Sequence, residues 1–392
     1  MPLIWRSLLA AGLALGLGLS ARAEVRPTGS ITPLEVDENG LLIVKVRLSS
    51  RKPGVADREF RFIFDTGASL NVVDASVPSE FLWEEPEKPK GASSSVGDYT
   101  GARIATRIVC LKRLEIAGMV REDLMAYRMD LKGTLLGSLQ DEPVDGILGM
   151  NFLRGTRFVL DPVAREVRWW HSLPGHRIPL AYTGSDNPAL QVKIGGTEVP
   201  CTLDTGANGG IQVPGEIGAS DSSEPFLFSG ASGEVKEGRA VKMGRLECGG
   251  KAWVDIPLEV VKPGEGSPNI GREVLWAAPM ELDFIDQWAT FTLDARGHLP
   301  YRKAPSRVVL RWERRPDGQR LRVGPVNPGS RWAKAGLMAG DEVLSVGPLE
   351  GSALTLRAVA ALQERGPALA WRIRREGVER VVQVSAAEGF VP

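Results

Sequence analysis

The stretch Phe-Arg-Phe-Ile-Phe-Asp-Thr-Gly-Ala-Ser at residues 60–69 returns in altered form as Val-Pro-Cys-Thr-Leu-Asp-Thr-Gly-Ala-Asn at residues 199–208. Both copies place Asp-Thr-Gly-Ala directly after an apolar run that is typical of a β-strand. A single Asp-Thr-Gly is a weak signal in a chain of 392 residues. Two copies in the same context indicate an internal repeat.

Three further landmarks follow the two copies in the same order. Residues 113–118 parallel residues 245–250, Ile147-Leu148-Gly149 parallels Asn269-Ile270-Gly271, and Leu160-Asp161 parallels Leu282-Asp283. The last two landmarks are 11 residues apart in both copies, whereas the earlier gaps differ as loop insertions would make them. We therefore expect two related units, at residues 24–172 and 176–300.

Within each unit the pattern favours short strands over long helices. In the first unit, residues 41–48 alternate imperfectly and return through a Pro-Gly loop to residues 59–64. In the second unit, residues 190–194 turn at Gly195-Gly196 into residues 198–203, and a Gly-Gly pair between alternating runs is a strong hairpin signal. The 45 glycines and 27 prolines suit many tight turns. These features predict a mainly β fold.

Composition excludes several classes of protein. Hydrophobic residues make up 43% of the chain and charged residues 24%, which argues against a disordered, fibrous or multi-span membrane protein. The 48 basic residues equal the 48 acidic ones, so no bulk charge favours nucleic acid as a partner. Three histidines and the spacing of Cys110, Cys201 and Cys248 match no metal motif. We expect no metal and no cofactor, and at most one disulfide.

The N-terminus has the pattern of a cleavable export signal. Arg6 supplies a positive charge, an apolar run covers residues 8–19, and Ala21-Arg22-Ala23 forms a small-residue cleavage site. We expect residues 1–23 to be a signal peptide that is cut after Ala23, and the mature protein to be secreted or periplasmic without an integral membrane span. The alternative is an uncleaved membrane anchor, although the run is short for a transmembrane helix.

The repeated motif has a mechanical logic. Asp65 and Asp204 come where a strand ends in a tight turn, and a glycine two residues later lets each turn approach its counterpart closely. Thr66 and Thr205 can hydrogen-bond across the junction. Two carboxyl groups held this close share one proton. The ionised group can then take a proton from a bound water while the protonated group donates to a scissile carbonyl, which hydrolyses an amide without metal or covalent intermediate.

Three other interpretations of the acidic pair remain open at this point. Asp favours turns, so both residues can simply cap the turns in which they lie. Paired carboxylates also hydrolyse glycosides, although the repeated Thr-Gly and the duplicated scaffold argue against that chemistry. A homodimer that pairs like units is a third arrangement, and it is unnecessary where one chain holds both motifs.

Residues 40–170 and 185–296 each resemble a lobe of a retropepsin-type aspartic protease, and their fusion resembles the bilobal pepsin-like arrangement. Ile147-Leu148-Gly149 matches the hydrophobic-hydrophobic-Gly signature of that family, and Asn269-Ile270-Gly271 matches it loosely. The resemblance implies Asp65 and Asp204 as the catalytic dyad. The supporting residues that it implies are Thr66, Gly67, Ser69, Thr205, Gly206 and Asn208.

The same resemblance implies two flaps, which are β-hairpins that close over a substrate and exclude water. The first flap candidate is the stretch 95–101, in which Tyr99 resembles the flap tyrosine of pepsin, and the second is the stretch 229–233. Ordinary hairpin turns are the alternative explanation for their glycines. The flap and substrate candidates are Tyr99, Thr100, Gly101, Gly230, Ser232 and Gly233.

The second copy departs from the family pattern in two places. Asn208 stands where the first copy has Ser69, and Gly209-Gly210 follow it. Asn269 replaces an expected apolar residue in the second signature. An Asn side chain offers other donors and another geometry than a Ser hydroxyl, so these differences concern how the second carboxyl group is supported.

Residues 303–392 form a third segment of a different kind. Ser330 is placed to cap a short helix, residues 354–365 are amphipathic, and residues 368–384 predict two strands. The run from Val326 to Leu344 resembles a PDZ domain of the bacterial periplasmic-protease type, and such domains bind peptide C-termini by strand addition. The groove candidates are Val308, Val309 and Leu310. The glycine expected there is absent, so a docking or structural role is the alternative.

The sequence as a whole predicts an exported, mainly β, bilobal aspartic endopeptidase with retropepsin-like barrel lobes and a C-terminal PDZ domain. Peptide or protein substrates are expected to lie extended between the lobes, and protein C-termini are candidate partners of the PDZ domain. The alternative is a non-catalytic peptide-binding protein of the cell envelope on a degenerate protease scaffold. The two readings differ in whether Asp65 and Asp204 lie within hydrogen-bond reach of each other.

Overall fold

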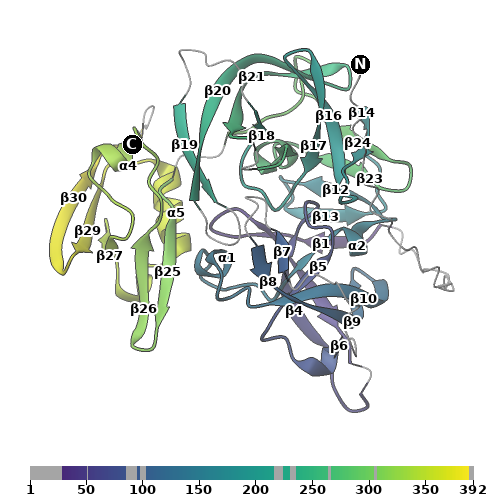
Figure 1. The fold of residues 1–392 in the computed structure, drawn as a ribbon, viewed down its shortest axis with the longest axis horizontal. Coiled ribbons are helices and arrows are strands. Elements are labelled where there is room, and N and C mark those ends of the chain that lie inside the picture. The colour runs from purple at the N-terminus through teal and green to yellow at the C-terminus, as the bar shows by residue number, and fades with distance from the viewer. Residues whose placement is uncertain are drawn as a thin grey trace, which may run out of the picture.

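The computed structural model describes residues 29–50, 52–84, 95–97, 103–215, 224–229, 235–263, 266–303 and 307–387. Strands dominate this part of the chain, which confirms the mainly β fold predicted from the sequence. They form two barrels, a sheet between the barrels and a separate C-terminal domain beside them (Figure 1). The expected signal peptide, residues 1–23, lies outside the described residues.

The first unit, lobe 1, is a closed barrel of six strands. The strand order is β3-β4-β11-β5-β10-β9, and β3 pairs with β9 to close the ring. Alternating apolar side chains such as Val44, Val46 and Phe62 fill its interior. Its elements are β2 (Glu35–Val36), β3 (Leu42–Leu48), β4 (Arg58–Phe64), β5 (Asn71–Asp74), η1 (Ser79–Phe81), β6 (Leu82–Glu84), β7 (Ser95–Gly97), β8 (Arg103–Ala105), β9 (Arg107–Ile116), β10 (Met119–Met129), α1 (Leu135–Ser138), β11 (Gly146–Leu148) and α2 (Met150–Leu153).

The second unit, lobe 2, repeats this topology. Its strand order is β16-β17-β22-β18-β21-β20, closed by pairing of β16 with β20. The hairpin between β16 and β17 turns at Gly195 and Gly196, whose φ values of 57° and 89° suit a tight turn. The elements are β15 (Ala181–Tyr182), β16 (Pro188–Ile194), β17 (Thr197–Leu203), β18 (Ile211–Pro214), β19 (Glu224–Ser229), β20 (Val235–Cys248), β21 (Lys251–Val261), β22 (Asn269–Ile270) and α3 (Arg272–Leu275).

A six-stranded sheet joins the two lobes. Its order is β1-β13-β12-β23-β24-β14, and the central pair β12–β23 aligns Phe158 with Leu282. The Leu-Asp landmarks of the two copies therefore lie on neighbouring strands. The strands of this sheet are β1 (Ile31–Pro33), β12 (Arg157–Asp161), β13 (Glu166–Trp169), β14 (His176–Pro179), β23 (Met280–Asp283) and β24 (Trp288–Phe291).

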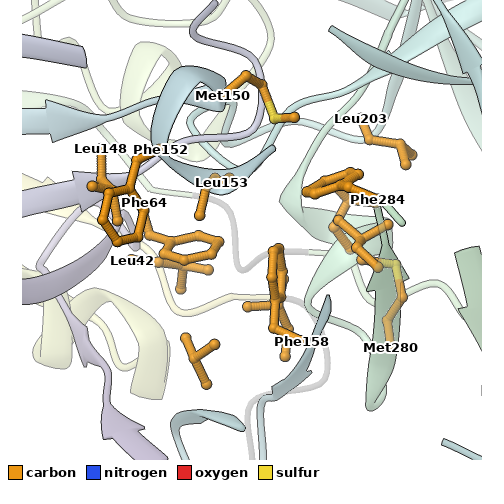
Figure 2. Packing of buried hydrophobic residues seen from close by; sticks show 14 of the residues in the cluster. Leu42, Phe64, Leu148, Met150, Phe152, Leu153, Phe158, Leu203, Met280 and Phe284 are labelled. Carbon is orange, nitrogen blue, oxygen red and sulfur yellow. The ribbon is translucent and has the colours of Figure 1, made fainter. Parts of the chain in front are cut away.

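One apolar core runs through both lobes and the sheet between them. Phe158 lies at its centre, 5.1 Å from Phe64 and 5.7 Å from Phe284 between ring centroids, in edge-to-face contacts. Figure 2 shows these rings with Leu203 and Met280 in one continuous cluster. The lobes therefore share a core, which fixes the ends of β4 and β17 relative to each other.

The C-terminal domain has its own core, built around Trp332 and Trp371 with ring centroids 5.7 Å apart. Its strand order is β25-β26-β27-β29-β30. Ser330 and Thr355 cap its two α-helices, with hydroxyls that accept from Ala333 N (3.2 Å) and Ala358 N (3.1 Å). The elements are β25 (Leu310–Arg315), β26 (Gly318–Val323), α4 (Arg331–Lys334), β27 (Glu342–Val346), β28 (Leu349–Glu350), η2 (Gly351–Ala353), α5 (Leu356–Arg365), β29 (Leu369–Arg375) and β30 (Val378–Val384).

Asp141 of lobe 1 attaches the C-terminal domain to the two lobes. Its Oδ1 accepts from Trp312 Nε1 on β25 and from Leu356 N at the start of α5, both at 2.9 Å, and its Oδ2 accepts from Arg357 N at 3.0 Å. A carboxylate is favoured at a helix N-terminus because the first N–H groups there lack partners within the helix. One side chain of lobe 1 thus binds both β25 and α5 of the C-terminal domain.

The three cysteines are free thiols. Burial raises the pKa of Cys201 and of Cys248 to about 12, so both remain protonated and behave as small apolar side chains. No helix in the described part of the chain is long and apolar enough to cross a membrane.

Candidate active site

Two matching turns place the acidic residues at the junction of the lobes. Asp65 follows β4 and Asp204 follows β17, and each is tied to the neighbouring parallel strand through its backbone N–H: Asp65 to Leu148 O (3.1 Å) and Asp204 to Ile270 O (3.0 Å). Each turn folds back on its own carboxylate. Gly67 N and Ala68 N donate to Asp65 Oδ1 at 2.7 and 3.1 Å, and Gly206 N donates to Asp204 Oδ1 at 2.9 Å.

The two carboxyl groups meet. Asp65 and Asp204 hydrogen-bond to each other, and each also lies against the glycine of the opposite turn. A Cβ on Gly67 would lie 2.4 Å from Asp204 Cγ, and a Cβ on Gly206 would lie 2.6 Å from Asp65 Oδ2. Since real Cβ atoms do not approach so closely, any larger residue at either position would separate the acidic pair.

The electrostatics of this pair favour one shared proton. Burial raises the pKa of Asp65, while the N–H groups of Gly67 and Ala68 offset part of that rise. Burial and then the charge of Asp65 raise the pKa of Asp204 well above its usual range. The two carboxyl groups therefore titrate as a pair, and one proton stays between them after the other has left.

Ser69 and Asn187 form a contact between the lobes that the sequence did not reveal. Ser69 Oγ donates to Asn187 Oδ1 at 2.7 Å, and Asn187 Nδ2 donates to the carbonyl of Gly67. Ser69 thus supports the first turn through Asn187, which lies just before β16 of lobe 2. No motif and no landmark of the repeat marks Asn187 in the sequence.

Asn208 occupies a different position from Ser69. It is exposed and lines a pocket of about 210 Å³ between lobe 2, lobe 1 and the C-terminal domain. Val308, Val309 and Leu310 line the same pocket from the other side. Strand β25 begins only at Leu310, and the N–H of Val308 donates to Gln363 Oε1 at 2.7 Å. The candidate groove residues and the second turn are therefore neighbours.

The flap candidates belong to hairpins whose tips lie outside the described residues. β7 pairs antiparallel with β8, and β19 pairs antiparallel with β20 up to Ser229 opposite Val235. The candidates outside the described residues are Tyr99, Thr100, Gly101, Gly230, Ser232 and Gly233. In the described ranges, no cluster of three or more His, Cys, Asp or Glu is arranged to hold a metal ion.

A family model for aspartyl proteases matches residues 53–152, which cover most of lobe 1 and include the first Asp-Thr-Gly turn. The two closed six-stranded barrels fit the lobes of pepsin-like proteases. No curated protein matches the chain.

Proposed function

We propose that this protein is an aspartic-type endopeptidase in which Asp65 and Asp204 form one catalytic dyad. The observation that carries the proposal is the hydrogen bond between these two carboxyl groups, which come from the equivalent turns of two repeated lobes. Neighbouring carboxyl groups that share a proton provide a base and an acid in one site. A turn-capping role alone would not require the two side chains to meet.

In the proposed reaction each carboxyl group has a separate role. Ionised Asp65 accepts a proton from a water held between the lobes, and the water oxygen attacks the carbonyl carbon of the scissile peptide bond. Protonated Asp204 donates its proton to the carbonyl oxygen, which gives a neutral tetrahedral diol. Collapse of the diol breaks the C–N bond: the proton on Asp65 passes to the leaving nitrogen, and one diol hydroxyl returns its proton to Asp204 as it becomes the carbonyl of the new C-terminus. The dyad then returns to one shared proton without a covalent intermediate.

We further propose that the C-terminal domain is PDZ-like and brings substrates or partner proteins to the lobes. The pocket between Val308, Leu310 and α5 supports this role, because apolar residues line it together with two cationic residues, Arg272 and Arg307, and one acidic residue, Glu38. The two cationic residues suit a peptide that ends in a carboxylate. Asn208 borders the pocket, so a peptide held there would lie beside the second turn.

Export is also proposed, on the basis of the N-terminal pattern at residues 1–23. The mature chain would then act in the periplasm or outside the cell. N-terminal sequencing of the protein recovered from outside the cytoplasm tests this, with Glu24 expected as the first residue. Recovery of Met1 on the mature protein would contradict it.

A non-catalytic peptide-binding protein is the second candidate, because neither Ser69 nor Asn208 donates to a carboxylate of the dyad in the hydrogen bonds described above. The test uses a mixture of peptides of unbiased sequence, incubated with the mature protein from pH 3 to pH 8 in water enriched in ¹⁸O. The enzyme is expected to produce new C-termini that carry ¹⁸O, and hydroxylamine is expected to trap no acyl intermediate. Peptides that are bound but never cut would favour the binding protein.

A further inference from the structure

Arg272 differs in kind from the residue that takes its place in the other lobe. Arg272 is the first residue of α3, and Met150 is the first residue of α2, the equivalent helix of lobe 1. Their backbone N–H groups have equivalent partners, Ala207 O at 2.9 Å and Ala68 O at 2.8 Å. The Met150 side chain is fully buried in the apolar core. Since an apolar side chain serves this place in lobe 1, the barrel itself does not require a cation there.

The guanidinium group of Arg272 reaches across to lobe 1. Its Nη2 donates to the carbonyl of Asn39 at 3.3 Å. Gly40 leaves room for the group, because a Cβ at that position would lie 2.0 Å from Arg272 Nη1. The third nitrogen, Nε, is buried and has no acceptor among the described residues. A buried donor without a partner is costly, so this N–H needs an acceptor that the described chain does not supply.

A second cation lines the same pocket. The pocket has a volume of about 210 Å³, and both Arg272 and Arg307 border it. Arg307 already has partners, since its Nη1 donates to the carbonyl of Glu38 at 2.6 Å and its Nη2 pairs with Glu364. Burial and the charge of Arg307 lower the pKa of Arg272 to about 10, so Arg272 stays charged in neutral solution. An anion in the pocket would relieve the repulsion between the two guanidinium groups.

The acidic groups near the pocket are engaged elsewhere. Asp37 and Glu273 attract Arg272, but each accepts a hydrogen bond from another group. Glu38, the acidic residue of the lining, has its own cation, since its Oε2 lies 3.7 Å from Arg357. Among the described residues, no carboxylate oxygen accepts a hydrogen bond from Arg272. The donors to Asp37 are Asn39 N, Leu41 N and Gln140 Nε2, and the donor to Glu273 is Tyr301 Oη.

The pocket lies close to the acidic pair. Asn208 borders it and comes four residues after Asp204, at the end of the second turn. Arg272 N also donates to Ala207 O within that turn. Four residues of chain span at most about 15 Å between Cα atoms. An extended peptide covers that distance in about four residues, at about 3.3 Å per residue. A peptide that runs from the dyad past Asn208 would therefore reach the pocket about four residues from the bond that is cut.

The strand across the pocket offers little backbone to such a peptide at Val308. Gln363 Oε1 accepts from Val308 N at 2.7 Å, and Gln363 Nε2 donates to Val308 O at 3.5 Å. The side-chain amide thus takes both groups that strand addition would use at this residue. Recognition in the pocket is left to side chains, which are apolar at Leu310 and Leu356 and cationic at Arg272.

We propose that this pocket is a carboxylate-binding subsite, in which Arg272 binds a carboxylate of the substrate about four residues from the peptide bond that is cut. The carboxylate belongs either to an acidic side chain or to the C-terminus of the peptide, since both present the same planar group to a guanidinium. This inference deepens the proposed endopeptidase function and rests on it for the position of the cut. Binding of the carboxylate can be measured without cleavage.

The first test compares three forms of one peptide mixture, with the cut positions read by mass spectrometry. One form is unmodified, one has amidated C-termini, and one has Asn and Gln in place of Asp and Glu. We expect cuts to concentrate about four residues from a carboxylate, and kcat/KM at those positions to fall about tenfold or more when that carboxylate becomes an amide. A fall in the amidated form assigns the C-terminus, and a fall in the Asn/Gln form assigns an acidic side chain. No fall in either form would overturn the proposal.

The variant Arg272→Gln tests the residue itself. It should cut the neutral form of each peptide as the wild type does and lose the preference for the carboxylate form. A merely structural role would lower kcat/KM for both forms equally, and that result would overturn the proposal. Arg296→Gln, at an exposed position of lobe 2, is the matched control and should keep the preference. If Arg272→Gln does not fold, Arg272→Lys replaces it, and an unchanged preference in that variant would also contradict the assignment of Arg272.

Binding separates this inference from the proposed function. If the protein cuts no peptide, fluorescence anisotropy with labelled peptides in carboxylate and amide forms takes the place of the cleavage assay. Tighter binding of the carboxylate form, lost in Arg272→Gln, would then support the subsite while the endopeptidase assignment fails. If the protein cuts peptides without regard to carboxylates, the endopeptidase assignment stands and the subsite fails.

Discussion

Thr66 and Thr205 hold each other's turns through reciprocal hydrogen bonds across the lobe junction. Thr205 Oγ1 accepts from Thr66 N at 3.0 Å, and Thr66 Oγ1 accepts from Thr205 N at 3.2 Å. Each hydroxyl also donates to the carbonyl that precedes the opposite Asp, at Leu203 O (2.6 Å) and Phe64 O (2.7 Å). Both threonines are fully buried. These four hydrogen bonds, called the threonine lock below, hold the two turns together and thereby keep Asp65 beside Asp204.

The first prediction concerns that lock. Thr66→Val keeps the shape of the side chain but leaves the carbonyl of Leu203 and the N–H of Thr205 buried without partners. We expect the free energy of unfolding to fall by about 2–4 kcal/mol, as measured in urea, because each buried orphan group costs about 1–3 kcal/mol. Thr197→Val, at an exposed position on β17, is the matched control and should change little. Equal effects of the two variants would mean that the lock does not stabilise the junction.

The second prediction concerns the stability of the acidic pair. Both members have raised pKa values, so the stability that they contribute is present below their ordinary pKa and is lost as the pH rises. The side chain of Asp204→Asn cannot ionise, so the variant does not lose this stability as the pH rises. We expect the variant to unfold with a free energy about 1–3 kcal/mol higher than the wild type at pH 7, and with a smaller difference near pH 3.

Urea denaturation between pH 3.5 and pH 7 measures this difference. Asp57→Asn, at an exposed position of lobe 1, controls for the loss of one acidic residue and should give the same small difference at every pH. A difference between Asp204→Asn and the wild type that does not grow with pH would show that the two carboxyl groups do not interact.

The third prediction concerns Asn187. Asn187→Ala removes the contacts to Ser69 and to the carbonyl of Gly67, which leaves the first turn free to shift relative to the second. We expect kcat for peptide cleavage to fall about tenfold with KM little changed, since a misplaced reacting group costs rate more than binding. Ser185→Ala, in the same loop, should retain the wild-type kcat. A rise in KM alone would instead place Asn187 at the substrate.

The fourth prediction concerns the attachment of the C-terminal domain. Asp141→Ala removes three hydrogen bonds to β25 and α5, whereas Glu142→Ala changes an exposed neighbour whose partner is Arg61. We expect Asp141→Ala to increase the radius of gyration in small-angle X-ray scattering and to speed proteolysis between lobe 2 and the C-terminal domain. Glu142→Ala should do neither. Unchanged scattering for Asp141→Ala would show that other contacts suffice.

The repeat is the reason that so much of the fold could be predicted from the sequence. Turns and short alternating strands are encoded locally, so the hairpin at Gly195-Gly196 and the helix after Thr355 follow from neighbouring residues. Two Asp-Thr-Gly motifs in equivalent contexts imply equivalent positions in two lobes, which places Asp65 near Asp204. The candidate groove residues show the limit of this local reasoning, because the side chain of Gln363, 55 residues further along the chain, takes the N–H of Val308.

Contacts between distant segments could not be predicted in this way. Asn187 reaches the turn of the other lobe, and Glu259 reaches Gly210 from a strand 49 residues further along the chain. Neither residue lies in a motif, because only the closed barrels bring them to the turns. The Gly209-Gly210 pair was visible in the sequence as a difference between the second copy and the first. Its physical reason is the carboxyl group of Glu259, which leaves no room for a Cβ at Gly209. Asp141 is likewise an ordinary loop residue until the C-terminal domain docks on it.

In the proposed enzyme, one chain supplies both halves of a single dyad. The most direct measurement is the rate of cleavage of a peptide mixture by Asp65→Asn and by Asp204→Asn, each alone and mixed in equal amounts, with Asp57→Asn as the control. We expect both variants to lose cleavage, the mixture to recover none and the control to cleave normally. Full activity of Asp204→Asn would contradict it, because the site would then be built from the first lobes of two chains.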